Sequence, residues 1–151
     1  MGQQQLILLV LATVIVGLAI IVGIRAFNEN SIKSNSDALI QDMVRIASDA
    51  QAWKQKPAPF GGQAEGAAKQ DVANYTGATL TGLGYQENGS NIYTNLNGQF
   101  KITGAATALT IRSYNDQKNN SAIVTVNGIS DTTITSTSVI LGTATGPPTG
   151  W

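Results

Sequence analysis

Residues 6–24 read LILLVLATVIVGLAIIVGI, and this stretch decides the fold. It contains no charged side chain, and Thr13 carries its only hydroxyl group. As an α-helix the run extends about 28 Å, close to the thickness of the hydrocarbon core of a bilayer. We therefore expect an apolar helix that can cross a membrane. A removed signal peptide is the alternative, although the run lacks preceding Lys or Arg and a clear small-x-small cleavage site.

The helical pattern continues beyond the apolar run. Six less polar residues follow at spacings of seven, four, three, four and three, which is one face of a helix. These residues are Ile32, Leu39, Met43, Ile46, Ala50 and Trp53. Asp42, Arg45 and Asp49 lie on the opposite side, where their spacing suits exposed ion pairs. The segment is therefore predicted to be amphipathic.

One helix is predicted from about Gln3 to about Gln55, a length of roughly 80 Å. Its end is marked by lysines and then by two prolines, which provide a C-terminal cation and a stop. Gly17, Gly23 and the Asn/Ser-rich stretch 28–36 are the places where the helix could bend or unwind.

The sequence after Asn91 changes to a period of two, which is typical of strands. Asn97-Gly98 is expected to form a type I′ hairpin turn, and Asn127-Gly128 a second Asn-Gly hairpin. Residues 64–75 are read as a short helix, and 116–120 as a polar loop. The expected strands span residues 92–96, 99–102, 107–114, 122–126 and 132–141.

The strands are only moderately hydrophobic, so one face of the sheet needs a cover. The apolar side of residues 39–53 is the obvious candidate. We therefore predict an α+β fold in which residues 1–55 form the long helix and residues 56–151 a small antiparallel β-rich head. Leu39, Met43, Ile46, Ala50 and Trp53 are predicted to pack the helix on the head.

Composition argues against several functions. Lys+Arg and Asp+Glu both number 9, so the net charge is zero and no basic nucleic-acid surface is expected. The chain has neither cysteine nor histidine, which removes thiol nucleophiles, the usual general base and the commonest transition-metal ligands. We therefore expect neither an enzyme nor a metal or cofactor site.

Two stretches carry a family resemblance. Residues 16–27, VGLAIIVGIRAF, resemble the run in type IV pilins that ends in Ile-Pro-Ala-Tyr, with Ile24 to Phe27 in that place. Residues 46–53, IASDAQAW, followed by Lys-Pro and Gly-Gly, resemble pilin-like proteins of some environmental bacteria. The resemblance covers about the first 60 residues. It implies a structural subunit of an extracellular filament that is inserted in the cytoplasmic membrane before pilus assembly machinery polymerises it.

In such a filament the apolar helix would be buried among copies of itself, and small residues would allow close approach. The expected core residues are Leu6, Leu9, Thr13, Gly17, Ile20, Gly23 and Ile24. The expected polar contacts between subunits are Gln3, Gln4, Gln5, Arg25 and Glu29.

The predicted polar contacts of Gln3 to Gln5 follow from a difference between this sequence and the family pattern. Pilins usually have a glutamate near the mature N-terminus, and the corresponding position here is Leu8. Our hypothesis is that the amides of Gln3 to Gln5 replace its hydrogen bonds; a solvated tail is equally open. Arg25 is either an interfacial charge that snorkels or a core-edge charge near Glu29.

Two other functions stay open. The chain could be a monomeric, membrane-anchored binding module, for example for a surface glycan, or a pseudopilin that acts as a short piston in secretion. Arg25, Lys33 and Arg45 follow the apolar run, so the positive-inside rule would place the head in the cytoplasm. The Thr/Ser/Asn/Gly-rich head is typical of extracellular proteins, and pilin-like proteins export it, so we predict an exported head.

Overall fold

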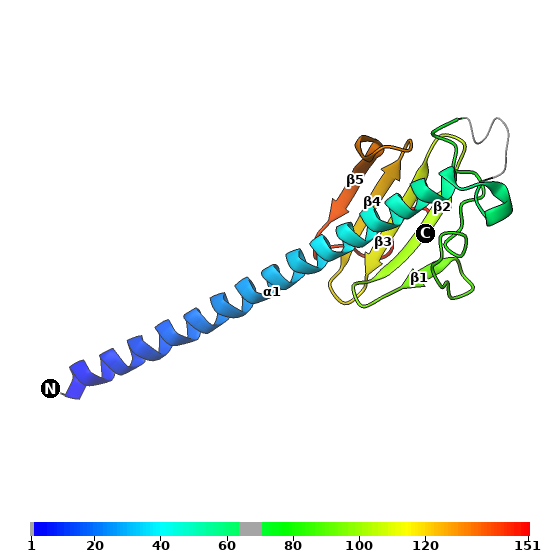
Figure 1. The fold of residues 1–151 in the computed structure, drawn as a ribbon. Helices are drawn as coiled ribbons and strands as arrows, with labels where there is room; N and C mark the ends of the chain where they lie inside the picture. Colours follow the sequence, from blue (N-terminus) through cyan, green and yellow to red (C-terminus); the bar gives the residue numbers. More distant parts are fainter. Residues whose placement is uncertain (1, 64–70) are drawn as a thin grey trace.

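A computed structural model describes residues 2–63 and 71–151. Its first element, α1, is an α-helix of 54 residues, Gly2–Gln55. Figure 1 shows α1 as one continuous rod whose N-terminal half projects away from the rest of the chain. The polar stretch 28–36 stays helical, as do Gly17 and Gly23. The predicted single long helix is therefore confirmed.

The helix ends where the sequence removes a hydrogen-bond donor. The amide of Lys56 still donates to the carbonyls of Ala52 (3.1 Å) and Trp53 (3.2 Å). Pro57 has no amide hydrogen and cannot continue the ladder. A short 3₁₀ turn, η1 (Ala58–Phe60), follows.

A five-stranded antiparallel sheet forms the head, and each strand pairs with the next one in the sequence. Figure 1 shows the C-terminal half of α1 crossing one face of this sheet. The predicted α+β arrangement is thus confirmed. The strands are β1 (Ile92–Thr94), β2 (Gln99–Gly104), β3 (Leu109–Asn115), β4 (Asn120–Val126) and β5 (Ile134–Ile140).

The core lies between α1 and the sheet. Leu39, Met43, Ile46 and Ala50 are at most 1% exposed, and Trp53 is 8% exposed. They share one cluster with inward-facing sheet residues, among them Phe100, Ile102, Leu109, Ile111, Val124 and Val126. Burying a large apolar side chain contributes about 1.5–3 kcal/mol. This contact therefore fixes the second half of α1 on the head.

The first Asn-Gly prediction is wrong in its turn type. β1 and β2 do form a hairpin, but four residues connect them, Asn95 to Gly98. Neither Asn97 nor Gly98 has the positive φ that a type I′ turn requires. Instead, the side-chain oxygen of Asn95 accepts the amides of Asn97 (2.9 Å) and Gly98 (3.0 Å). The asparagine side chain, rather than a tight backbone turn, shapes this loop.

The second Asn-Gly prediction is wrong in its tight turn. β4 and β5 do pair as antiparallel neighbours, but residues 127–133 connect them, and this longer loop includes a 3₁₀ turn, η2 (Asp131–Thr133), before β5 begins. The side-chain amide of Gln51 on α1 donates to the carbonyls of Gly128 (3.1 Å) and Ser130 (3.0 Å). These long-range hydrogen bonds hold an open loop against the helix end.

The helix predicted over residues 64–75 lies partly outside the described residues, because 64–70 are not described. Residues 71–75 are turn and coil, so the prediction is wrong there. The carboxylate of Asp71 accepts the amide of Ala73 (3.0 Å), and the amide of Tyr75 donates to the carbonyl of Ala105 (2.8 Å). The amides of residues 73 and 75 thus bond to a nearby side chain and to the loop between β2 and β3 instead of to a helix.

Candidate interaction surface

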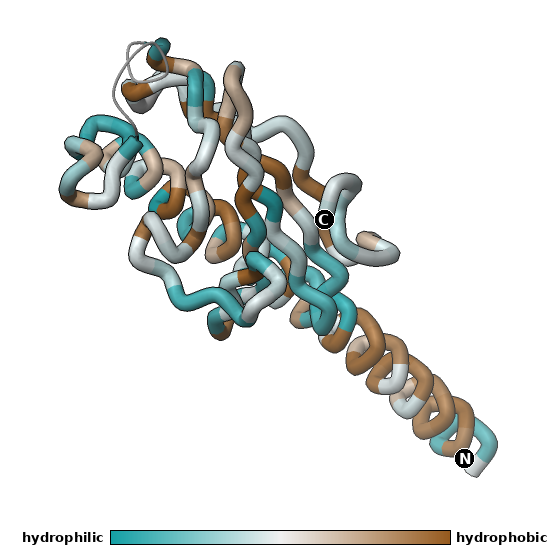
Figure 2. Tube along the Cα trace, turned by 90° about the vertical axis from the view of Figure 1, so that its right-hand side faces the viewer, coloured by the Kyte–Doolittle hydropathy of each residue, from teal (hydrophilic) through white to brown (hydrophobic). Residues whose placement is uncertain are grey.

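The most unusual surface of the molecule is the projecting half of α1. Every residue from 2 to 30 is exposed, and we call this segment the stem. Figure 2 shows it as an almost continuous hydrophobic rod that ends at the N-terminus. By length and composition α1 can cross a membrane; a signal sequence near an N-terminus has the same properties.

Over residues 6–24, apolar side chains surround the stem on all sides. Fourteen large aliphatic residues between 6 and 24 are each one-half to two-thirds exposed. Covering them would contribute on the order of 15 kcal/mol, comparable to the net stability of a whole domain. Exposed apolar patches of this size mark protein or membrane contacts. The stem therefore needs an apolar environment that residues 2–63 and 71–151 do not supply within one copy.

The predicted core residues of a filament all lie on this stem. Leu6, Leu9, Thr13, Gly17, Ile20, Gly23 and Ile24 are exposed. The hydroxyl of Thr13 donates to the carbonyl of Val10 at 2.8 Å, so the one side-chain donor in the run is already satisfied inside the helix. Gly17 and Gly23 leave open space around the positions where a Cβ would stand. The surface is compatible with close packing by another helix.

The predicted polar contacts lie at opposite ends of the stem. Gln3, Gln4 and Gln5 are exposed at the tip, and Arg25 and Glu29 are exposed near the head. Twenty residues separate Gln5 from Arg25, about 30 Å along the helix. The fold of one chain therefore does not bring these two groups together.

A polar junction fixes the stem to the head. Asn120, 1% exposed, donates through its side-chain amide to the carbonyl of Ile32 (2.9 Å) and to Asn35 Oδ1 (2.9 Å). Asn35 Nδ2 in turn donates to the carbonyl of Asn97 (3.0 Å). We did not predict these contacts from the sequence. The available signal was position, since Asn35 stands one helical turn before Leu39 and shares its face.

The carboxylates predicted to form surface ion pairs hold the head loops instead. Asp42 Oδ2 accepts hydrogen bonds from the side-chain amides of Asn95 (2.8 Å) and Asn97 (2.7 Å). The hydroxyl of Tyr85 donates to Asp49. Burial, followed by this hydrogen bond, raises the pKa of Tyr85 above its usual range. Both acids therefore help to fix the head on α1.

Lys54 also forms hydrogen bonds that hold the head on α1, at the end of the helix. It is 2% exposed, and its ammonium donates to Gln63 Oε1 (2.9 Å) and to the carbonyl of Asn74. It also lies over the ring of Tyr75, 5.2 Å from the centroid. Burial lowers the pKa of Lys54, and the charge of Asp71 partly opposes this. The lysine ties the segment after α1 back to the helix.

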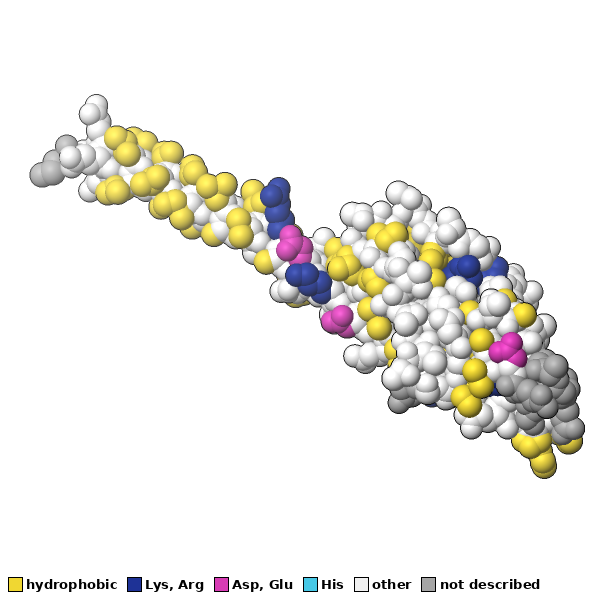
Figure 3. Space-filling view, turned by 90° about the horizontal axis from the view of Figure 1, so that it is seen from above, with side chains coloured by type: hydrophobic (Ala, Val, Ile, Leu, Met, Phe, Trp, Pro, Cys, Tyr) yellow, Lys and Arg dark blue, Asp and Glu magenta, His cyan; other side chains and the backbone are white. Residues whose placement is uncertain are grey.

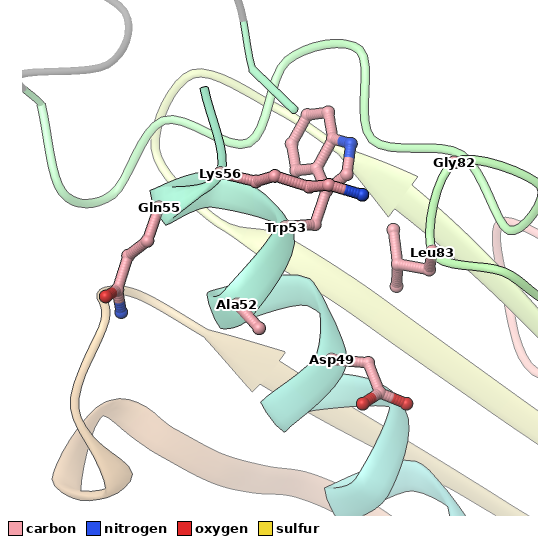
Figure 4. A pocket seen from close by; sticks show the side chains of 7 residues that line it. All are labelled: Asp49, Ala52, Trp53, Gln55, Lys56, Gly82 and Leu83. Carbon is pink, nitrogen blue, oxygen red and sulfur yellow. The ribbon is translucent and has the colours of Figure 1, made fainter. Parts of the chain in front are cut away.

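A shallow hollow lies beside the end of α1, with a volume of about 530 Å³ (Figure 4). Asp49 and Lys56 are the charged side chains that line it, and Trp53 forms part of its wall. The lining includes no hydroxyl, thiol or imidazole, and Asp49 is already bonded to Tyr85. Within residues 2–63 and 71–151, no group of three or more acidic, His or Cys residues could hold a metal ion. Among the described residues, the stem carries most of the exposed large apolar side chains.

Comparisons with models of protein families, with curated proteins and with solved structures find no match to this chain.

Proposed function

We propose that this chain is the structural subunit of an extracellular, type IV pilus-like filament that polymerises through its stem. The observation that carries the proposal is the continuity of α1. One unbroken helix is apolar on all sides over residues 6–24 and is then packed on the head from Leu39 to Trp53. A helix that is hydrophobic all round is suited to complete burial.

Such a helix has two suitable environments. In a bilayer lipid solvates it, and in a filament copies of the same helix would surround it. The exchange between the two leaves the hydrophobic contribution almost unchanged, because lipid tails and leucine side chains are equally apolar. Release into water would expose the fourteen aliphatic side chains. The subunit can thus wait in the cytoplasmic membrane, and assembly machinery can move it into a fibre that persists outside the cell.

The direction of the contact supports a polymer. Stems that pack side by side and in parallel would have their heads at one end of the contact. If neighbouring copies are also shifted along the stem axis, the contact does not close by rotation and generates a helical fibre. The role proposed is structural, and no catalytic, metal or cofactor chemistry forms part of it.

A membrane-anchored monomeric binding module is the second candidate. One observation favours it, since the length of residues 6–24, about 28 Å, matches a single bilayer. In that case the protein would remain a monomer in detergent or lipid. A pseudopilin would form fibres only when overproduced.

The test compares the same substitution on two exposed surfaces. Leu9, 64% exposed, lies on the stem, and Leu96, 103% exposed, lies on a head loop. Full-length protein, L9E and L96E are purified in detergent, the detergent is removed, and fibres are sought by sedimentation and negative-stain microscopy. We expect fibres from the wild type and L96E and none from L9E, with equal thermal unfolding of the head. Dispersed wild-type protein that enters vesicles as monomers would overturn the proposal in favour of the anchored module.

A further inference from the structure

Four charged residues lie on α1 where the stem meets the head. Arg25, Glu29, Lys33 and Asp37 stand at every fourth position, alternate in sign and are all exposed. Figure 3 shows basic and acidic side chains alternating along the helix between the apolar stem and the head. We call these four residues the charge row. It extends about 18 Å along the helix axis.

The charge row is one of the ridges along which helices pack. Residues four apart lie next to each other on the surface of a helix and form an inclined ridge. The same ridge continues toward the N-terminus through Ile21, Gly17 and Thr13, which belong to the apolar surface. A neighbouring stem that packs along the apolar part of this ridge would therefore meet the charges where the ridge reaches the head.

The alternation makes the charge row complementary to a shifted copy of itself. Neighbours in the proposed fibre point the same way. Where the charge rows of two such copies face each other with no axial shift, each charge would meet its own like charge. A shift of one step, four residues or about 6 Å, opposes Arg25 to Glu29, Glu29 to Lys33 and Lys33 to Asp37. A shift of two steps again opposes like charges, and three steps leave a single attractive pair.

We propose that the charge row is a contact between copies of this chain and that it selects an axial stagger of about 6 Å between neighbouring stems. This inference rests on the proposed filament function. It concerns the axial register between neighbouring stems, which the apolar surface cannot select. Aliphatic side chains pack in many registers with similar energy, whereas charges separate attractive from repulsive registers. The occupant of this surface is a second, parallel copy.

The same residues could also act inside one helix, because opposite charges four apart stabilise a helix slightly. Mixing experiments separate the two roles. The variant R25E/K33E has an entirely acidic row, and E29K/D37K has an entirely basic row. The variant R25E/E29K/K33E/D37K inverts every sign and keeps the alternation. K56E/K118E matches the charge change of the acidic variant at positions outside the row.

The measurement is the lowest protein concentration at which fibres sediment after detergent removal, at low salt. We expect this concentration to rise on the order of tenfold for the acidic and the basic variants, since attractive pairs become repulsive. An equimolar mixture of the two should assemble near the wild-type concentration, as should the inverted variant and K56E/K118E. The differences should shrink in 1 M salt, where the screening length is about 3 Å.

Each of the following three results would overturn the inference. Like-charge variants that assemble at the wild-type concentration would show that the row makes no contact between copies. A mixture that assembles no better than its components would show that the row acts only within its own helix. If the wild type and the inverted variant themselves form no fibres, the filament function fails and this inference fails with it. Circular dichroism of each variant checks that α1 is intact.

Discussion

The two halves of α1 share one helix and differ in everything around it. The stem, residues 2–30, is exposed and over residues 6–24 apolar on all sides, whereas residues 31–55 bury one face and use polar side chains to bind the head. Both halves have the same backbone hydrogen bonds. Helical structure alone therefore does not show which environment each half occupies. The width of the apolar surface decides whether a segment packs within the chain or needs another molecule.

The largest difference between the two halves is expected when one leucine in each half is replaced by alanine. Leu39 is 1% exposed against the sheet, and Leu11 is 53% exposed on the stem. We expect L39A to lower the free energy of unfolding of the head by about 2–5 kcal/mol, because it leaves a cavity. L11A should change it by no more than about 0.5 kcal/mol. Urea unfolding in detergent measures both, and equal losses would contradict the division of the helix.

Two glycines provide a second comparison between the packed head and the exposed stem. A Cβ on Gly98 would lie 2.7 Å from the carbonyl oxygen of Tyr114 and 2.8 Å from Leu39 Cδ2, whereas a Cβ on Gly23 would meet open space. G98A should therefore destabilise the head by about 1–3 kcal/mol through overpacking. G23A should leave the head unchanged and favour the stem helix by up to about 1 kcal/mol. Unfolding of the head and stem helicity provide the measurements, and a harmless G98A would refute the close approach.

The junction between the halves depends on one buried amide. N120A removes the donor to Ile32 and Asn35 and the oxygen that accepts the amide of Gly142 (2.8 Å). We expect a loss of about 1–3 kcal/mol, since buried partners are left unsatisfied. Hydrogen exchange should quicken between residues 31 and 36 and not over 6–24. N120D, which keeps the acceptor, separates the two contributions.

Alkaline pH should affect the halves differently. Burial raises the pKa of Tyr75 to about 12, so above pH 10 the unfolded chain loses this proton first and the folded head loses stability as pH rises. Lys54 has the opposite effect on the stability of the head below pH 10.5. Burial lowers its pKa, so the unfolded chain binds more protons there and stability rises with pH. Between pH 10.5 and 12 the head should therefore weaken, and Y75F should reduce the slope. Residues 6–24 contain no titratable group, so the apolar contact itself should not respond.

Much of this division could be predicted from the sequence. The apolar run and the 3.6-residue period give both halves of α1, because each residue's environment follows from the helix geometry alone. The strands follow from a period of two, with β3 and β5 each starting two residues later than expected. Local patterns are sufficient where one face of an element meets one core.

Other features depended on partners far along the chain. Asn-Gly normally indicates a tight turn, but Asn95 and Gln51 supply hydrogen bonds that favour open loops. Asp42 looked like a surface acid until the fold brought two asparagine amides to it. The segment 71–75 is not helical, and the amide of Tyr75 donates instead to the carbonyl of Ala105 in the loop between β2 and β3. The Asn95 contacts are local, two and three positions along the chain. The contacts of Gln51, Asp42 and Tyr75 join residues tens of positions apart, and no short window of sequence contains both partners.

The most direct test of the account is cryo-electron microscopy of full-length protein after detergent is removed without added lipid. We predict fibres in which residues 6–24 of each copy form the centre, surrounded by the same segment of other copies, with the heads outside. A sample of separate molecules, or fibres held by head contacts with residues 6–24 still in detergent, would contradict the central claim that the stem is covered by its own copies.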